Sequence, residues 1–387
     1  MPHVRSARRL RPLFPILLLA LIASPAAAQG TGRSMDIDGS AISSAMGGAS
    51  TAVFWSAEPN VWANPALLGY YHGAGFQYAH SQLVPGLATD VTLNSNHTTL
   101  AAYGVGLELA NTKLDYGESE EVDGGGSEIG TFNSYEKVGI AGVGVSLSGL
   151  TGAIAPRSPL ARWGRNFDLA AGLARKHVDI RLAPSWLSGT TSGTTWDMGM
   201  LARGGFDLAG AAVPMRLDLS LGAAVLNFND VLFTFINEDQ ASPPTRMRRL
   251  GGAARFSVGL PAARSAAGSA FRKAFLRGLD PLVSLGAAWD EEHVQAGSSS
   301  AGGYDVHHGG MELAFLNILA VRFGHATDRL GEIDGSTFGV GVGIPVAGVA
   351  GARYDYGRYP QSTSLPSVTR HTVSVFVDPL AIWRLQK

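Results

Sequence analysis

The chain has 387 residues, of which only 16% are charged and 50 are glycine, and it contains no cysteine. The lack of cysteine excludes disulfides and thiolate metal sites, and a formal net charge of -1 gives no reason to expect nucleic acid as a partner. Ordinary soluble domains have roughly 25% charged residues, so this composition favours the glycine-rich, charge-poor strands of a membrane barrel. A soluble protein of two domains is the alternative suggested by length.

The first 28 residues have the pattern of a secretory signal peptide. An apolar stretch runs from Leu13 to Ala23, and the small residues Ala26-Ala27-Ala28 provide a cleavage site. The arginines before this stretch are Arg5, Arg8, Arg9 and Arg11. The apolar run is shorter than the roughly 18 to 20 residues that a helix needs to span a bilayer, so we expect residues 1–28 to be removed.

Asn64-Pro65-Ala66 predicts a short helical turn ahead of the first strand. Asn64 can cap the turn, Pro65 occupies the first helical position, and Gly69 can end it. A turn this small must be buried against something. We therefore expect residues 29–72 to form a plug, which we call the hatch; an ordinary surface turn is the alternative for the tripeptide alone.

Residues 73–377 alternate between apolar and small or polar side chains. In the segment Thr337–Ile344, Phe338 and Val340 share a face with two further apolar residues, while three glycines share the other face with Thr337. A soluble sandwich would bury the apolar face, whereas a membrane barrel would expose it to lipid, and alternation alone does not distinguish the two.

The spacing of these segments predicts about 14 strands, at roughly 25 residues for each strand and its connection. Thirteen candidates can be delimited, one of them at Thr98–Leu109, and a short strand at Ala88–Asn94 or Thr112–Tyr116 gives the even number expected of bacterial barrels. The predicted fold is an all-β transmembrane antiparallel barrel with a helical hatch in its lumen and a C-terminal tail at residues 378–387.

Several features should lie at the barrel ends. The acidic, glycine-rich stretch Gly117–Glu128 predicts a long extracellular loop. Ser265–Gly278 predicts a short helix, either amphipathic at the membrane interface or solvated in a loop. Aromatic residues near predicted strand ends suit the interfacial girdles of a barrel; they are Tyr70, Tyr71, Trp163, Trp196, Trp289, Tyr354, Tyr356 and Tyr359.

Together with the export signal and the wall pattern, a series of short motifs resembles the PorV/PorQ branch of the FadL-like outer-membrane proteins. In chain order they are Met46-Gly47-Gly48-Ala49, Trp62–Leu68, Leu83–Asp90, Trp196–Gly199, Gly309–Leu313 and Val321–Gly324. The resemblance implies a 14-stranded barrel with a luminal hatch whose motif residues are Met46, Gly47, Gly48, Asn64, Pro65 and Ala66. Many outer-membrane barrels end on an aromatic residue, whereas Asp378–Lys387 follow Phe376-Val377 here.

Charged residues within predicted strands should face the lumen, because Arg or Lys at the bilayer midplane costs ~2 to 4 kcal/mol. They are Asp197, Arg203, Asp218, Arg322, Arg353 and Asp355. They form either a latch or polar pathway beside the hatch, or salt bridges that brace the interior. Arg322 and Arg353 are long enough to bond the terminal carbonyls of hatch helices.

The sequence contains no hydrolase, zinc-protease or phosphate-loop motif, so we expect no enzyme activity and no cofactor. The acidic residues of Gly117–Glu128 could gather calcium, but their spacing matches no EF-hand loop and a solvated loop explains them without a ligand. His307, His308 and His325 could hold a transition metal only if adjacent strand residues shared a face, which they do not. The paired glycines Gly142 and Gly144, or Gly339 and Gly341, indicate close packing at the wall.

Two functions in the bacterial outer membrane fit these features, with lipid as the surrounding partner. One is a PorV-like role in type IX protein secretion, in which the barrel binds secreted cargo domains and secretion-system components; it predicts a plugged lumen. The other is FadL-like transport of hydrophobic small molecules, which predicts an apolar pocket above the hatch and a lateral gap in the wall. The Leu83–Asp90 stretch favours the first. A soluble exported β protein is a third alternative.

Overall fold

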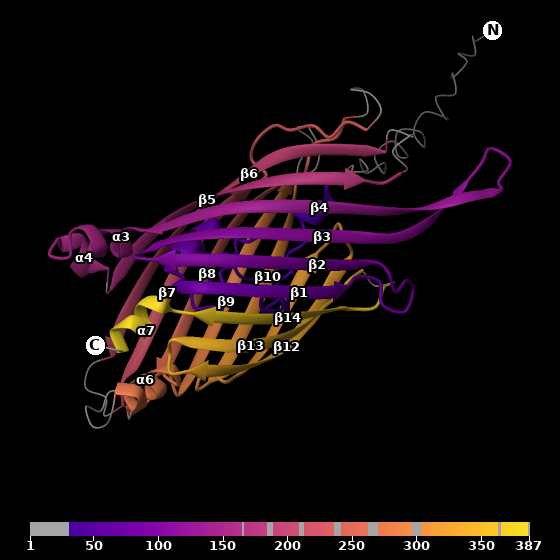
Figure 1. Cartoon of the computed structure of the whole chain (residues 1–387). Helices are drawn as coiled ribbons and strands as arrows, with labels where there is room; N and C mark the ends of the chain where they lie inside the picture. Colours follow the sequence, from indigo (N-terminus) through magenta and orange to yellow (C-terminus); the bar gives the residue numbers. More distant parts are fainter. Residues whose placement is uncertain are drawn as a thin grey trace, which may run out of the picture.

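The computed structural model describes residues 31–164, 166–183, 189–208, 213–235, 241–261, 270–295, 303–362 and 365–385, and the proposed signal peptide lies outside them. Fourteen strands form a closed barrel in which each strand pairs antiparallel with its sequence neighbours and β1 pairs with β14 (Figure 1). This confirms the predicted 14-strand antiparallel barrel and its N-terminal helical segment.

The elements follow one another in a simple up-and-down order. The strands are β1 (Gly73–Gln82), β2 (Thr92–Ala102), β3 (Val105–Val122), β4 (Glu128–Ser146), β5 (Phe167–Arg181), β6 (Thr190–Leu208), β7 (Met215–Leu226), β8 (Arg246–Val258), β9 (Val283–Gln295), β10 (Tyr304–Phe315), β11 (Leu319–Asp328), β12 (Ile333–Val346), β13 (Ala350–Tyr359) and β14 (Val368–Val377). The helices are η1 (Arg33–Met35), α2 (Ala41–Ala45), η2 (Pro65–Tyr70), α3 (Leu147–Ile154), α4 (Pro159–Trp163), α6 (Ala270–Gly278) and α7 (Pro379–Leu385).

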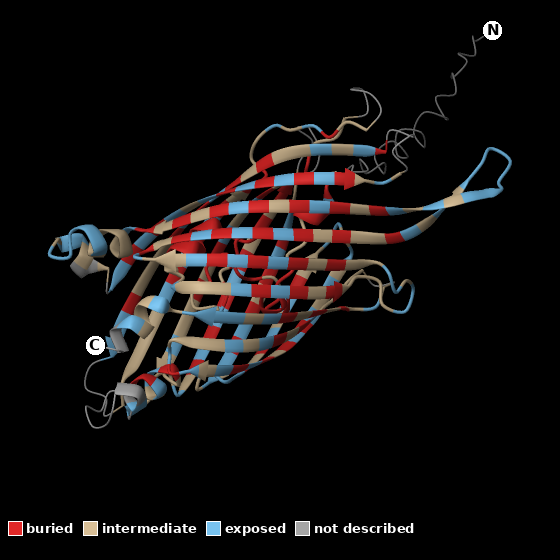
Figure 2. Ribbon diagram, viewed as in Figure 1, coloured by how far each residue is buried: buried red, intermediate tan, exposed pale blue. Residues whose placement is uncertain are grey.

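Figure 2 shows buried and exposed residues alternating along the strands. In β5, Leu169 and Leu173 are about two-fifths exposed, whereas the alternate residues face the lumen and include Lys176, which is fully buried. The same arrangement holds in β12, where Phe338 and Ile344 are exposed and Thr337 is buried. The apolar face of the wall therefore points outward, as in a membrane barrel and opposite to a soluble sandwich.

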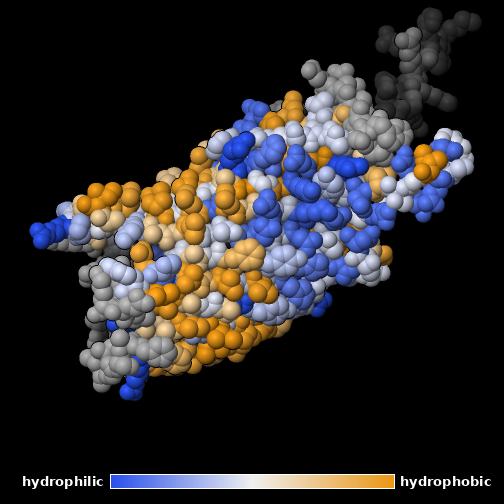
Figure 3. Space-filling view, in the orientation of Figure 1, coloured by the Kyte–Doolittle hydropathy of each residue, from blue (hydrophilic) through white to orange (hydrophobic). Residues whose placement is uncertain are grey.

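The two ends of the barrel differ. At the terminal end, β1 begins and β14 stops, and helices α3, α4, α6 and α7 gather; the opposite end, which we call the hairpin end, carries the tip of the β3–β4 hairpin (Figure 1). Apolar side chains cover the wall near the terminal end, and polar side chains cover it toward the hairpin end (Figure 3). Along β5, the outward residues change from Phe167, Leu169 and Leu173 to Arg175 and His177.

Four of the predicted girdle aromatics lie where the outward face changes from apolar to polar. Trp289, for example, stands between the outward Ala287 and Glu291 of β9. Trp196, Tyr354 and Tyr356 occupy similar positions on β6 and β13. The prediction is wrong for Tyr70, Tyr71 and Tyr359, which line luminal cavities, and the side chain of Trp163 is outside the described part of the chain.

The predicted strand Thr98–Leu109 is wrong, because the chain reverses within it. Tyr103 and Gly104 have φ angles of 55° and 77° and form a two-residue turn between β2 and β3. Alternation continues through this turn, so periodicity gave no sign of it. The extra strand sought at Ala88–Asn94 or Thr112–Tyr116 is instead the beginning of β2 or the middle of β3.

The acidic stretch Gly117–Glu128 is also not the long loop we expected. β3 continues to Val122 and β4 starts at Glu128, so only a tight turn remains, in which Asp123 Oδ1 accepts from the amides of Gly125 and Ser127 at 2.8 and 2.9 Å. β2 and β5 stop pairing before this region, at Asp115 and Tyr135 respectively. The hairpin therefore projects beyond its neighbours (Figure 1).

The helices of the described residues lie at the ends of the barrel and in the lumen. The helix predicted at Ser265–Gly278 is α6, Ala270–Gly278, and residues 262–269 are outside the described part of the chain. The tail after Val377 continues as α7. Among the described residues, no helix has both the length and the apolar character needed to cross a membrane.

Candidate functional site

Residues 31–72 run through the lumen, where α2 contacts β11 to β14 and η2 contacts β3 to β6. The predicted Asn64 cap forms: Asn64 Oδ1 accepts from the amide of Ala66 at 3.0 Å, and Pro65 occupies the first turn. Asn64 Nδ2 also donates to the carbonyl of Met200 in β6 at 3.0 Å. Asn64, Pro65 and Ala66 are all buried inside the barrel, so the cap also attaches the hatch to the wall.

The Met46-Gly47-Gly48 segment lies against β10 and β11. Gly47 and Gly48 have φ angles of 71° and 91°, which side chains other than glycine rarely adopt. A Cβ on Gly47 would lie 2.5 Å from the carbonyl oxygens of Gly309 and His325. His308 Nδ1 donates to the carbonyl of Gly47 at 2.7 Å. The motif is thus a tight turn that brings hatch backbone onto the wall.

Asp290 of β9 accepts hydrogen bonds from two consecutive backbone amides of the hatch. Its Oδ2 accepts from the amides of Ser50 and Thr51 at 2.8 and 2.9 Å, and the side chain is fully buried. Sequence analysis did not select Asp290, although it is a charged residue on the luminal face of a strand. Hydroxyl groups of the wall add further bonds, from Ser220 to the carbonyl of Ala52 and from Thr337 to that of Ala45.

A girdle of luminal glycines surrounds the hatch. A Cβ on Gly172 would lie 2.3 Å from the Pro65 carbonyl carbon, and one on Gly310 would lie 2.4 Å from the Met46 carbonyl oxygen. Eleven wall glycines would meet hatch atoms, all closer than 3.0 Å: Gly106, Gly144, Gly172, Gly199, Gly222, Gly251, Gly310, Gly324, Gly339, Gly357 and Gly75. The first four are direct cross-strand partners. The girdle explains much of the glycine in the wall.

Two of the six predicted luminal charges act on the hatch through aromatic rings. Arg203 lies over the rings of Phe54 and Tyr70, at 5.1 and 4.7 Å from their centroids. Asp197 acts through Lys176, whose Nζ lies 2.8 Å from Asp197 Oδ2 and 4.7 Å from the ring centre of Trp62.

The other four charges pair within the wall. Arg322 donates to Glu312 and Asp355, both at 2.7 Å, and Arg353 donates to the second oxygen of Asp355 at 2.7 Å. Asp218 accepts from Arg216 at 2.8 Å. These bonds are salt bridges within the wall, as the alternative of interior bracing predicted for these residues.

Arg370 makes the contact that we expected of Arg322 and Arg353. It donates to the carbonyl of Asp38 and to the hydroxyl of Ser44 in the hatch. Arg322 and Arg353 instead bond to carboxylates of the wall, Glu312 of β10 and Asp355 of β13. Sequence analysis assigned no role to Arg370, although it shares the luminal face with Thr372 and Ser374.

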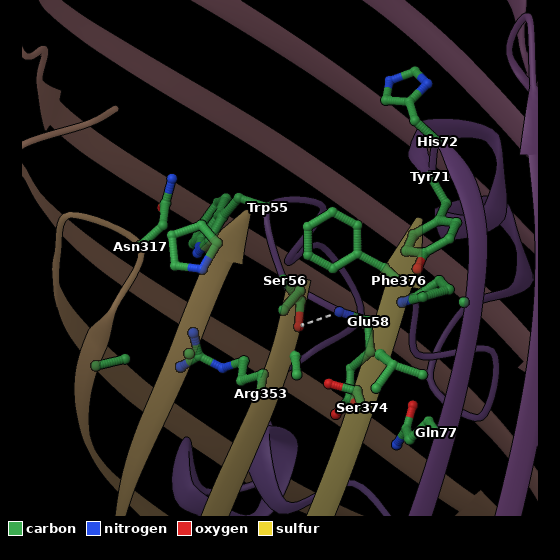
Figure 4. A pocket seen from close by; sticks show the side chains of 18 of the residues that line it. Trp55, Ser56, Glu58, Tyr71, His72, Gln77, Asn317, Arg353, Ser374 and Phe376 are labelled. Carbon is green, nitrogen blue, oxygen red and sulfur yellow. Dashed lines mark hydrogen bonds between the residues drawn. The ribbon is translucent and has the colours of Figure 1, made fainter. Parts of the chain in front are cut away.

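A cavity of about 420 Å³ lies between the hatch and the terminal end of the wall. Its hatch side includes Trp55, Glu58 and Tyr71, which face Arg353 and Phe376 of β13 and β14 (Figure 4). Ser40 donates to Glu58 Oε1 at 2.9 Å, and the other carboxyl oxygen of Glu58 is buried without a hydrogen-bond partner among the described residues. The cavity thus combines aromatic surfaces with enclosed polar groups.

A second, charged cavity of about 220 Å³ lies toward the hairpin end, where Tyr304 and Tyr359 line it. Its other lining groups include Arg33, Asp36, Arg249, Glu292 and Arg370. The pocket on this side is therefore polar, contrary to the apolar pocket that the transporter hypothesis placed above the hatch. The lateral gap is also not seen: within the described strands, every neighbouring pair around the barrel is hydrogen-bonded.

Two carboxyl groups of the hatch have raised pKa values. Burial raises the pKa of Glu58 to about 7, and the nearby Asp355 carboxylate adds to this effect while Ser40 opposes it. Burial likewise raises the pKa of Asp36 to about 7, against the opposing charge of Arg33. Both groups therefore bind protons more tightly in the docked hatch than in an unfolded one.

We expect the docked hatch to be most stable at low pH. A raised carboxyl pKa stabilises the docked state fully below the ordinary value of 4.5, and that stabilisation is lost as the pH rises through about 7. For Glu58 the difference is about 3 kcal/mol. Amide hydrogen exchange in residues 40–60, corrected for intrinsic rates, should therefore be slower at pH 5 than at pH 8.

The Glu58→Gln variant should reduce this pH dependence, because glutamine stays neutral. Glu118→Gln in the exposed hairpin provides the matched control and should leave the dependence unchanged. Equal protection of the hatch at both pH values would contradict the expectation.

Among the described residues, no three His, Asp or Glu side chains lie together in a group that could hold a metal ion. His307 and His325 point outward from β10 and β11, whereas His308 points into the lumen toward the hatch. The acidic residues of the β3–β4 hairpin do not form such a group either.

No protein-family model matches the chain, and no curated protein does. Similar solved structures include the Pseudomonas putida toluene transporter TodX, with 12% identity over 88% of this chain and 97% of that one and a TM-score of 0.36. Another is a Pseudomonas aeruginosa FadL homologue, with 8% identity over 87% of this chain and 98% of that one and a TM-score of 0.39. These structural neighbours are FadL-type barrels, and the low TM-scores mean that the similarity carries no functional argument.

Proposed function

We propose that this protein is an outer-membrane transporter in which a small hydrophobic molecule binds in the luminal cavity and passes when the hatch moves. The cavity itself is the supporting observation. Its volume of about 420 Å³ falls within the range of small-molecule sites, and Trp55, Tyr71 and Phe376 provide aromatic surface. The protein has no catalytic role in this proposal.

The outer surface supports a membrane location. Outward residues of β9 and β13 change from apolar to aromatic to charged along each strand, and Figure 3 shows the wall changing from hydrophobic to hydrophilic. This is the order found across a barrel from the bilayer core to the headgroups. The terminal end has the start of β1, the end of β14 and very short turns, such as Tyr103-Gly104 and Leu316–Ile318. Short turns characterise the periplasmic side of bacterial barrels, so the proposed orientation puts the hairpin end outside.

Filling the cavity should block uptake. Ser374 lines the cavity from β14, and a tryptophan there would occupy its space, whereas Val375 is 46% exposed on the outer face and provides a matched control. In bacterial cells that express the protein in the outer membrane, we expect Ser374→Trp to lower the initial rate of radiolabelled naphthalene uptake at least fivefold. Val375→Trp should change that rate by less than twofold.

Outer-membrane fractions should first establish that both variants are present as folded barrels. Rapid uptake by the Ser374→Trp variant would show that the solute does not pass through the cavity. If the unsubstituted protein gave no more uptake than cells lacking it, the proposed transport function would be wrong.

PorV-like secretion is the second candidate. The plugged lumen fits both functions, so the observation that favours secretion is the β3–β4 hairpin, which projects beyond the wall with Glu118, Glu120 and Glu121 along it. Photo-crosslinking from Glu120 in intact cells tests this function. Recovery of one defined exported domain, lost when residues 118–132 are removed, would support cargo binding; solute uptake without any such crosslink would oppose it.

A further inference from the structure

The luminal cavity has more positive than negative groups. Its lining contains the carboxyl groups of Glu58 and Glu312, and four arginines: Arg255, Arg277, Arg322 and Arg353. Arg255, Arg322 and Arg353 all interact electrostatically with Glu312. One carboxylate therefore balances only part of the charge of the three arginines around it.

Asp355, which lies behind the cavity lining, reduces the excess of positive charge but does not remove it. Its two oxygens accept from Arg322 and Arg353, so that one carboxylate serves two guanidinium groups. Arg322 is already engaged twice, since it also donates to Glu312 at 2.7 Å, and it is only 2% exposed. Arg353 has its single described hydrogen bond through Nε, so unlike Arg322 it has a buried guanidinium nitrogen, Nη2, without a partner among the described residues.

Several polar atoms of residues that line this cavity have no hydrogen-bond partner among the described residues. Arg353 Nη2, Arg255 Nε and Trp55 Nε1 are enclosed donors with no hydrogen-bond partner among the described residues. Glu58, which is 5% exposed, has an unpartnered Oε2 at the same cavity. Three donors of this kind match a ligand that carries acceptor oxygens, and enclosed donors favour an ionised acceptor most strongly.

Aromatic groups line the rest of the space. Trp55 and Tyr71 come from the hatch, and Phe376 projects from β14 (Figure 4). A flat ring can stack against such side chains, with centroid separations of roughly 4.5 to 7 Å.

We propose that the cavity selects an aromatic carboxylate, with its carboxylate group toward Arg353 and its ring among Trp55, Tyr71 and Phe376. This inference rests on the proposed transport function and names the substrate class of that site. Arg353 would need only a side-chain rotation to turn Nη2 toward the ligand while Arg322 keeps its bond to Asp355. Protonated Glu58 can donate to the same carboxylate, so its pKa of about 7 makes binding stronger at pH 6 than at pH 8.

Three ligands of nearly equal size test the charge preference. The full mature chain in lipid nanodiscs is titrated calorimetrically at pH 6 with 1-naphthoate, neutral 1-naphthalenemethanol and cationic 1-naphthylmethylammonium. We expect naphthoate to bind at least tenfold more tightly than the alcohol, and the ammonium most weakly. Arg353→Gln should weaken naphthoate binding about tenfold and change alcohol binding by less than twofold; Arg358→Gln, outward on the same strand, should change neither.

The outcomes separate this inference from the function on which it rests. Equal binding of naphthoate and the alcohol, or tighter binding of the ammonium, would overturn the preference for carboxylates while leaving hydrophobic transport intact. Binding of none of the three, together with no naphthalene uptake by cells, would overturn both. Because the three ligands are compared on the unsubstituted protein, the test does not depend on whether the Arg353 variant folds.

Discussion

Replacing Asp290 with alanine is expected to loosen the hatch. Asp290 is fully buried and accepts from two hatch amides, Ser50 and Thr51, through one carboxylate oxygen. Hydrogen bonds to a charged group contribute about 1.5–3 kcal/mol each, and alanine would leave both amides buried without an acceptor. The docked hatch should therefore lose about 3–5 kcal/mol, which corresponds to a rise of about two to four orders of magnitude in its open population.

Hydrogen exchange at the amides of Ser50 and Thr51 measures this effect directly, because both amides are protected only while the hatch is docked. The control is Glu291→Ala, since Glu291 is the next residue of β9 and points outward. We expect that control to leave both amides protected. Unchanged exchange in Asp290→Ala would mean that other contacts hold this segment without the carboxylate.

A leucine at Gly310 is expected to displace the hatch by steric conflict. A Cβ there would lie 2.4 Å from the carbonyl oxygen and 2.6 Å from the Cβ of Met46. The first of these atoms belongs to backbone, so no rotation of a side chain can relieve the contact. Overpacking typically costs about 1–3 kcal/mol, and a backbone conflict on the girdle should reach at least the upper part of that range.

The adjacent glycine supplies a closely matched control. A Cβ on Gly309 would have nothing within 4 Å, because this residue faces outward from β10. In planar lipid bilayers, Gly310→Leu should show ion-conducting openings at least tenfold more often than the unsubstituted barrel, and Gly309→Leu should not. A closed Gly310→Leu barrel with normal hatch protection would show that the hatch can shift without leaving the lumen.

These two variants test different parts of one attachment. Asp290 holds the hatch by hydrogen bonds at β9, whereas the girdle glycines allow close approach around most of the barrel. Arg370 adds a contact from β14, and Arg203 adds one from β6 through aromatic rings. The hatch is thus attached to many strands at once, so opening it requires either a large movement or the rearrangement of one segment beside the cavity.

Local features of the structure were predictable from neighbouring residues. The Asn64 cap and the Pro65 turn depend on side-chain and backbone preferences within a few positions, and both form. The alternation in Thr337–Ile344 likewise predicted a strand, which is part of β12. By contrast, the turn at Tyr103-Gly104 was missed, because a two-residue turn interrupts neither the alternation nor the apolar run around it.

The sequence by itself determined the period of the strands, the approximate number that close the barrel and the capped turn ahead of them, because these depend on short-range geometry. Only the tertiary structure decided which face of each strand meets the lumen. It also showed that Asp290 and Arg370 contact the hatch, while Arg322 and Arg353 pair within the wall. The physical reason is that the hatch contacts of Asp290 and Arg370 join residues more than 200 positions apart, and the register of the closed barrel sets which residues meet.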